Sequence, residues 1–201
     1  GKLMKAYYAK QDAEKLSGKG DTSQKLTLMK TSADSLKKSA DALNDSSLWE
    51  KKKIKKKDEK TGEEIEVEDY DWDKITKAVK SFVEDYNDVV KEAGESNTKD
   101  VLRNASWMTG MTDKNSNMLA KIGITIGKGN KLELDEDALK QADISSLKTV
   151  FTGYNSFVSK ISQKATGISN AANRASATYT NNGTYSKTAS SLTSSKIDKE
   201  V

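Results

Sequence analysis

The sequence predicts a mainly α-helical protein, an antiparallel coiled-coil or helical-bundle stem with two small β-hairpins. Two stretches carry apolar residues at alternating spacings of three and four, the heptad pattern of packed helices. The chain has no proline, and long helices gain most from excluding it because proline breaks the helical hydrogen-bond ladder. Hydrophobic residues make up 34% and charged residues 32%. This composition suits narrow apolar seams between helices better than a round core.

The length of 201 residues predicts one main domain with arms. We expect an N-terminal helical arm over residues 1–20, a helical stem domain over 21–175 and a polar C-terminal tail over 176–201. Gly18 and Gly20 break the first helix, which begins at Lys2. The tail is rich in serine, threonine and asparagine, so it cannot bury an apolar face by itself.

The two heptad stretches predict the contact that holds the stem together. In the first, the apolar stripe runs from Leu26 to Leu43 with alanines at alternate positions, which permits close helix approach. In the second, it runs from Trp72 to Val89. The predicted helix-packing seam consists of Leu26, Met29, Leu36, Leu43, Trp72, Ile75, Val79, Phe82 and Tyr86.

Between these stretches, residues 51–69 predict a charged β-hairpin inserted into the stem. Its first half is rich in lysine and its second half in glutamate, with a turn sequence over 58–62. Antiparallel pairing places the opposite charges beside each other. A second hairpin is predicted from the short alternating segments 124–126 and 131–134, followed by a short helix capped by Asp135.

The remaining helices have weaker signals. Gly94 is expected to close the helix that begins at Trp72 as its C′ residue. Residues 96–122 predict one helix or a helix pair, with a break near Gly110 and 112–117. One long final helix is expected to start near Ser145, with a stripe that continues through Leu147, Phe151, Tyr154, Val158 and Ile161.

Several classes of site are excluded by composition and spacing. The chain has no cysteine and no histidine, which excludes disulfides, Cys/His zinc sites and histidine-based triads. Asp113, Asn115 and Asn117 match the opening of a calcium loop, but Met118 and Ile124 stand where glycine and glutamate are needed. We therefore expect no catalytic residue, no cofactor, no metal and no membrane span.

Three short patterns resemble a known family in their order along the chain. Residues 82–89 begin with F-V-x-x-Y-N, residues 119–124 match L-x-x-I-G-I, and residues 131–139 end with L-x-L-D-E-x-x-L, with Asn130 where glycine is usual. These patterns resemble the flagellar hook-associated protein 2 family, the filament cap. The family-like motif residues are Ile122, Gly123, Ile124, Leu132, Leu134, Asp135, Glu136 and Leu139.

This resemblance implies a structural protein rather than an enzyme. It implies a stem built from N- and C-terminal helices, export to the extracellular flagellum, and protein partners that are further copies of the chain, flagellin or hook-end axial proteins. In the family, large variable β domains stand where this chain has only residues 51–69. The chain therefore resembles a reduced form of the family.

Three other interpretations stay open at this point. One is a secreted or surface helical binding module, adhesin-like and without a flagellar role. Another is a nucleic-acid binder that uses the lysines of 51–57, whose affinity would fall steeply with salt. Because the acidic half of the hairpin neutralises those lysines, we expect no nucleic acid. The third is an enzyme that uses lysine, aspartate, glutamate or tyrosine.

Overall fold

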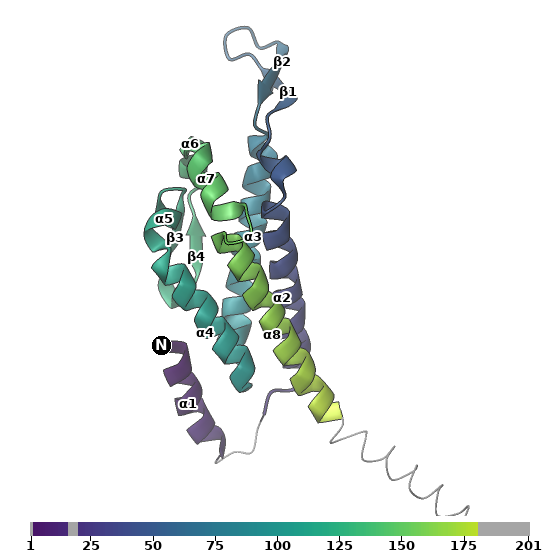
Figure 1. The fold of residues 1–201 in the computed structure, drawn as a ribbon, viewed down its shortest axis with the longest axis vertical. Helices are drawn as coiled ribbons and strands as arrows, with labels where there is room; N and C mark the ends of the chain where they lie inside the picture. The colour runs from purple at the N-terminus through teal and green to yellow at the C-terminus, as the bar shows by residue number, and fades with distance from the viewer. Residues whose placement is uncertain (1, 16–19, 181–201) are drawn as a thin grey trace, which may run out of the picture.

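The computed structural model of the chain (Figure 1) describes residues 2–15 and 20–180, with the side chains of residues 11–15, 179 and 180 left out. Its elements are, in chain order, α1 (Lys2–Lys15), α2 (Ser23–Leu43), the 3-10 turn η1 (Ser46–Trp49), β1 (Lys52–Lys57), β2 (Glu64–Asp69), α3 (Trp72–Gly94), α4 (Lys99–Lys114), α5 (Ser116–Ala120), β3 (Ile124–Ile126), the 3-10 turn η2 (Lys128–Asn130), β4 (Leu132–Leu134), α6 (Glu136–Gln141), α7 (Ile144–Phe151) and α8 (Phe157–Thr180). The prediction of a mainly α-helical fold with two small hairpins is confirmed.

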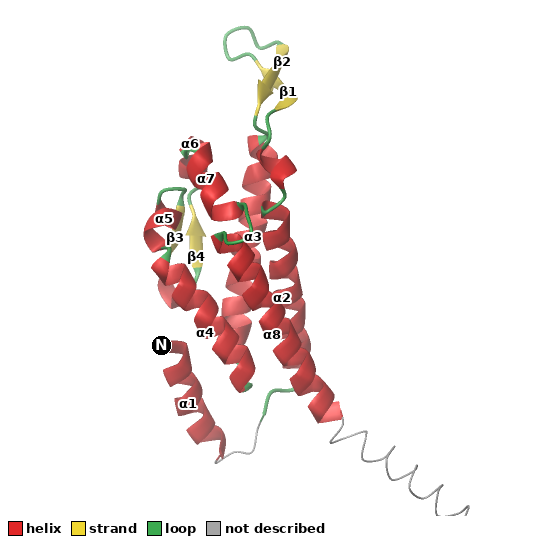
Figure 2. Cartoon of the chain, in the orientation of Figure 1, coloured by secondary structure: helices red, strands yellow, loops and turns green. Residues whose placement is uncertain are grey.

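Four helices form the body of the molecule. Helix α2 packs against α3 and α8, and α4 packs against α8 and α3, with neighbouring helices antiparallel (Figure 2). The apolar stripes of these helices meet along the axis, where Leu36, Phe82, Met108 and Ile161 are fully buried. No described helix is both long and apolar enough to cross a membrane.

The charged hairpin extends beyond one end of the bundle (Figure 1). Strands β1 and β2 are antiparallel, and the register opposes Lys53 to Glu68, Lys55 to Glu66 and Lys57 to Glu64. Ion pairs join Lys53 to Glu66 at 3.8 Å and Lys56 to Asp69. Opposite charges therefore stand beside each other along the ladder, as the sequence predicts.

The second hairpin lies against the side of the bundle. Strands β3 and β4 pair antiparallel, with Ile124 opposite Leu134 and Ile126 opposite Leu132. Helix α5 packs against β3, and β4 packs against α3, while α7 packs against α5 and α8. Trp49 closes the end of the core that lies nearest the charged β1–β2 hairpin. The centre of its ring stacks 5.5 Å from that of Phe151, and its indole N–H donates to the Leu43 carbonyl at 2.7 Å.

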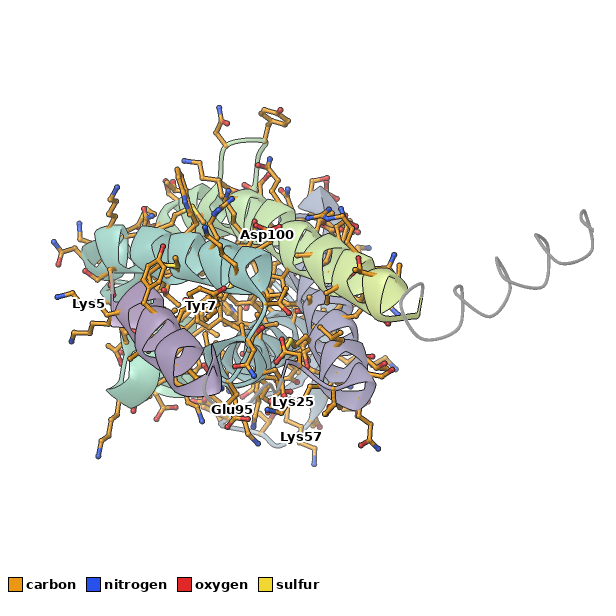
Figure 3. The ribbon with its side chains drawn as sticks, turned by 90° about the horizontal axis from the view of Figure 1, so that it is seen from below. Lys5, Tyr7, Lys25, Lys57, Glu95 and Asp100 are labelled. Carbon is orange, nitrogen blue, oxygen red and sulfur yellow. The ribbon has the colours of Figure 1, made fainter. Side chains whose placement is uncertain are left out.

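At the opposite end, Asp21 ties the start of α2 to the loop between α3 and α4. Its carboxylate accepts hydrogen bonds from the Ser96 hydroxyl at 2.9 Å, the Asn97 amide at 2.8 Å and the Thr98 hydroxyl at 2.6 Å. Helix α1 packs against α4. In the view from below, Tyr7 lies on the side of α1 that faces the bundle and Lys5 points away (Figure 3).

The expectation of one continuous helix after Ser145 is wrong. The chain forms α7 and α8 instead, separated by residues 152–156. Thr152 leaves α7 in an extended conformation, and Gly153 follows with φ +99°, a value that favours glycine. Tyr154 therefore lies in the turn with 82% of its surface exposed. Phe151 and Val158 are both buried and keep the helical spacing of apolar residues across the turn. The sequence pattern therefore gives no sign that the helix is interrupted here.

One smaller expectation about a helix end is also wrong. Gly94 is the last helical residue rather than the C′ residue, because Glu95 caps α3 in a right-handed conformation. The break expected near Gly110 and 112–117 is present at Asn115, between α4 and α5, and Gly110 itself lies inside α4. The predicted tail over 176–201 overlaps the end of α8, and residues 181–201 lie outside the described residues.

Candidate functional site

The seam residues predicted on α2 and α3 all contribute to the core or its edge. Leu26, Met29, Leu36 and Leu43 on α2 are buried, and so are Ile75, Val79, Phe82 and Tyr86 on α3. Trp72 is half-buried at the hairpin end, where its ring meets Tyr70 at 6.2 Å. These side chains therefore lie on the inner faces of two helices that pack directly against each other.

Helix α2 also packs extensively along α8. Both helices carry buried alanines seven residues apart, Ala33 and Ala40 on α2 and Ala165 and Ala172 on α8, and we call these four residues the alanine seam. Small side chains allow two helix backbones to approach closely. Helix α2 and the last helix among the described residues, α8, therefore form the most extensive helix contact of the bundle.

Two identical polar contacts border this alanine seam, one heptad apart. The Ser169 hydroxyl donates to Asp34 at 2.6 Å, and the Ser162 hydroxyl donates to Asp41 at 2.6 Å. Each aspartate also accepts from the lysine four residues before it. The contacts of Asp34 and Asp41 thus fix the axial register of α2 against α8.

These contacts were not predicted from the sequence, although a signal for them is present in it. The pattern Lys-x-Ser-Ala-Asp occurs over residues 30–34 and again over 37–41. In each copy of the repeat, the aspartate directly follows the buried alanine on the same helix. This pattern indicates a helix interface whose apolar contact is bordered by charged side chains. What the sequence did not indicate is which helix supplies the donors.

The electrostatics of the two aspartates follow from this geometry. Partial burial raises the pKa of Asp34, but the hydrogen bonds from Lys30 and Ser169 outweigh it, so the pKa lies below 3.8. At Asp41, partial burial likewise opposes the bonds from Lys37 and Ser162, and the pKa is again lowered. Both carboxylates are therefore held in their charged form.

Elsewhere in the bundle, burial raises two pKa values. Desolvation raises the pKa of Tyr86, whose hydroxyl donates to Thr112 at 2.8 Å inside the core. Desolvation also raises the pKa of Asp85, despite a hydrogen bond from Ser39, and the charges of neighbouring acids on α3 add to the rise. Tyr86 thus acts as a neutral structural link between α3 and α4.

The family-like motif residues gather around the second hairpin. Ile122, Ile124, Leu132 and Leu139 are buried, and Leu134 is half-buried. Gly123 has φ +88°, and a side chain there would lie 2.7 Å from the Asp135 carbonyl oxygen. The Asp135 amide donates to the Gly123 carbonyl at 2.8 Å.

The end of the motif belongs to the short helix α6. The Asp135 side chain caps it by accepting from the Ala138 amide at 3.0 Å. Glu136, in its first turn, forms an ion pair with Lys80 of α3 at 3.3 Å. The motif is therefore a packing unit, in which a glycine, a cap and an ion pair hold hairpin, α6 and α3 together.

Asn87 joins this unit to the seam. Its side-chain amide donates to the Leu132 carbonyl at 2.9 Å, and its carbonyl accepts from the Leu132 amide at 2.7 Å. This two-way bond satisfies both backbone groups of one residue in β4. The asparagine of the F-V-x-x-Y-N pattern thus connects α3 to the second hairpin.

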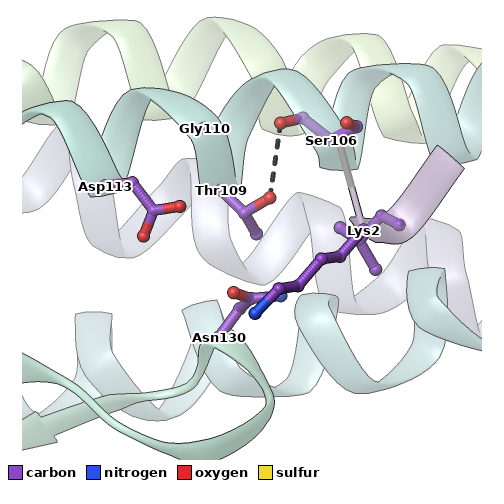
Figure 4. Close-up of a pocket in the computed structure, with 7 residues that line it drawn as sticks. Lys2, Ser106, Thr109, Gly110, Asp113 and Asn130 are labelled. Atoms are coloured by element: carbon purple, nitrogen blue, oxygen red, sulfur yellow. Dashed lines mark hydrogen bonds between the residues drawn. The ribbon is translucent and has the colours of Figure 1, made fainter. Parts of the chain in front are cut away.

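One pocket brings several polar groups together and is the place to look for reactive chemistry. It lies where α1, α4 and η2 meet, and Lys2, Thr109, Asp113 and Asn130 contribute polar groups to it (Figure 4). The dashed bond there runs from the Thr109 hydroxyl to the Ser106 carbonyl, a contact within α4. Among the side chains that the structure describes, no group of three or more acidic residues is arranged to hold a metal ion.

Comparison with known families then decides the assignment. The family model described as flagellar hook-associated protein 2 C-terminus matches residues 96–200, which is more than half of the chain. The chain belongs to this family. A search of curated proteins and a search of solved structures returned no match.

The hook-associated protein 2 match covers α4 to α8, and so it contains the whole second-hairpin motif and the α8 side of the alanine seam. The seam residues from Leu26 to Tyr86 precede the matched segment. The family is that of a structural protein of the flagellar cap. This agrees with a molecule whose most elaborate contacts join helices to one another.

Proposed function

We propose that this protein is the stem of a reduced filament cap, exported to the outside of the cell, which assembles by helix packing with axial flagellar subunits. The family match supports a flagellar, cap-like structural role. The observation that carries the proposal is the α2–α8 pair, in which early and late helices of the chain form the central contact of the stem.

Exposed apolar side chains toward the end of the bundle opposite the charged hairpin support this proposal. Leu28 on α2 is 52% exposed and Tyr8 on α1 is 50% exposed. A further helix that packed against either one would bury it, and a buried leucine contributes about 2 kcal/mol. Copies of the chain, flagellin and hook-end proteins are the partners that we expect to supply such a helix.

Light scattering over a wide range of protein concentrations tests this proposal, both alone and with purified flagellin or hook-end protein. We expect a discrete oligomer, or a complex that forms when an axial protein is added. Leu28→Glu should weaken either one without changing helicity. The matched control is Ser81→Glu, which adds the same charge at an exposed position of α3 and should change neither. A monomer at every concentration that ignores both partners would refute the assembly role.

The packing seam can be tested separately. Replacing Leu36 and Phe82 together with aspartate puts two charges into fully buried positions, so the stem should unfold. Circular dichroism measures the loss of helix, and full retained helicity would contradict the role assigned to the seam.

One observation favours a second function, that of a secreted or surface helical binding module. Only the η1 turn and the short β1–β2 hairpin connect α2 to α3, where the family resemblance leads us to expect large β domains. Under this alternative the protein stays monomeric and binds a ligand through its exposed surface. The same scattering experiment distinguishes the two functions.

A further inference from the structure

An exposed tryptophan stands out on the face where α4 and α8 adjoin. Trp107 is 64% exposed, whereas Trp49 is 2% exposed. It lines a surface groove with Met111, one helical turn further along α4. Exposed aromatic side chains of this kind are enriched where proteins bind other proteins.

The rim of this groove is positively charged. Lys114 on α4 and Lys160 and Lys164 on α8 line it, with no acidic side chain among the lining residues. The Lys164 ammonium lies 4.7 Å from the centre of the Trp107 ring. None of the ion pairs found among the described residues involves these three lysines.

The placement of the lysines concentrates charge rather than spreading it. Lys160 and Lys164 are four residues apart on one helix, a spacing at which like charges repel. Of the acids on α4, Asp100 pairs with Arg103 at 3.4 Å, and Asp113 lines the separate pocket beside α1. An anionic group bound in the groove would relieve the repulsion between the lysines, so the groove is complementary in charge to an acidic ligand.

We propose that the groove of Trp107, Met111, Lys114, Lys160 and Lys164 binds an acidic segment of a partner protein that carries a large apolar side chain. The apolar side chain would cover Trp107 and Met111, and the flanking carboxylates would pair with the three lysines. This surface is separate from the α2–α8 seam, and the proposal does not depend on the flagellar role.

Other occupants fit the chemistry less well. Residues 181–201 contain three lysines and two acidic residues, so the C-terminal segment of the chain lacks the acidic excess that the groove favours. A single-stranded nucleic acid would meet only one aromatic ring and three cations, without the extended basic track that such ligands follow. The compact apolar floor favours a protein segment.

Fluorescence anisotropy tests the proposal with the full chain and a labelled probe peptide of about ten residues. The probe has glutamates on both sides of a central leucine-phenylalanine pair. We expect saturable binding, about tenfold weaker for Lys160→Glu with Lys164→Glu and for Trp107→Ala. The matched control, Lys77→Glu with Lys91→Glu at exposed positions of α3, carries the same charge change and should bind within about twofold of the unchanged protein.

The comparison ligands complete the test. A peptide with serines in place of the leucine-phenylalanine pair, and one with lysines in place of the glutamates, should both bind at least about tenfold more weakly. The proposal is overturned if the acidic peptide does not bind, if the α3 control loses affinity equally, or if an oligothymidylate of similar length binds more tightly. Concentration-dependent burial of Trp107 without any ligand would also overturn it, because a second copy would then occupy the groove.

Discussion

Ser162 of α8 donates a hydrogen bond of 2.6 Å to Asp41 of α2, and the two residues are 121 positions apart in sequence. The same contact recurs one heptad away between Ser169 and Asp34. Two equal bonds at a spacing of seven residues hold the helices in one register, because a slide by one turn would break both.

This pair predicts how the stem responds to acid. An aspartate whose pKa is lowered in the folded state stabilises the fold above its unfolded value of 3.8 and loses that contribution as the pH falls through the folded pKa. Ser162→Ala with Ser169→Ala should therefore lower Tm by roughly 4 °C at about pH 7. The difference from the unchanged protein should shrink as the pH falls below 3.8.

Thermal melts followed by circular dichroism at several pH values measure this difference directly. Asp45 and Asp69, whose pKa values are also lowered by hydrogen bonds, affect both proteins alike. Ser35→Ala, on the exposed face of α2, serves as control and should leave Tm nearly unchanged. A Tm difference that is constant with pH would contradict the role of the charged aspartates.

We expect Trp49, which stacks on Phe151, to contribute far more to the stability of the fold than the exposed Trp107. Trp49→Ala removes both the stack on Phe151 and the bond to Leu43, which should cost about 3–5 kcal/mol. Trp107→Ala should change stability by no more than about 0.5 kcal/mol because Trp107 is exposed. Urea unfolding measures both values, and equal costs would show that Trp49 does not close the core.

Gly123 predicts a strong effect of one added methyl group. A Cβ there would lie 2.7 Å from the Asp135 carbonyl oxygen and 2.9 Å from the Leu139 amide, in a left-handed conformation. Gly123→Ala should therefore destabilise the protein by about 2 kcal/mol or more. Gly110→Ala meets no atom within 4 Å inside α4, so it should stabilise by about 0.5–1 kcal/mol. Chemical unfolding of both variants reveals whether these opposite signs hold.

We expect the substitution Asn87→Ala to loosen β4 locally without unfolding the rest of the protein. Asn87→Ala breaks both bonds to Leu132, so the backbone of β4 should open more easily. Hydrogen exchange at the Leu132 amide should speed up by about tenfold or more, while amides in α2 keep their protection. Unchanged exchange at Leu132 would mean that the asparagine clamp contributes nothing to the hairpin.

The sequence predicted the helical parts of this fold well, because heptad spacing reports directly which face of a helix is buried. Leu36 and Phe82 were placed inward on that basis, and both hairpins followed from their alternation. The turn at Gly153 was not predicted, since apolar residues on either side of it happen to keep the helical spacing. The partner of α2 along its alanine face was also missed, because spacing within one helix does not identify the neighbour.

The functional surface was less predictable than the fold. Trp107 is one of three tryptophans in the chain, and its exposure depends on how α4 lies against α8. Lys160 and Lys164 come from another helix, more than 50 residues away in sequence. Surfaces that combine two helices in this way emerge only once the helices are packed.

The β1–β2 hairpin leaves and re-enters the stem at neighbouring points, because Lys52 pairs with Asp69 at its base. Its two ends are thus about 5 Å apart, the separation of adjacent strands. Any polypeptide whose own termini emerge side by side can be spliced in at this place while α2 and α3 keep their packing. The segment between α2 and α3 can therefore be lengthened, shortened or replaced without any change to the residues of the core.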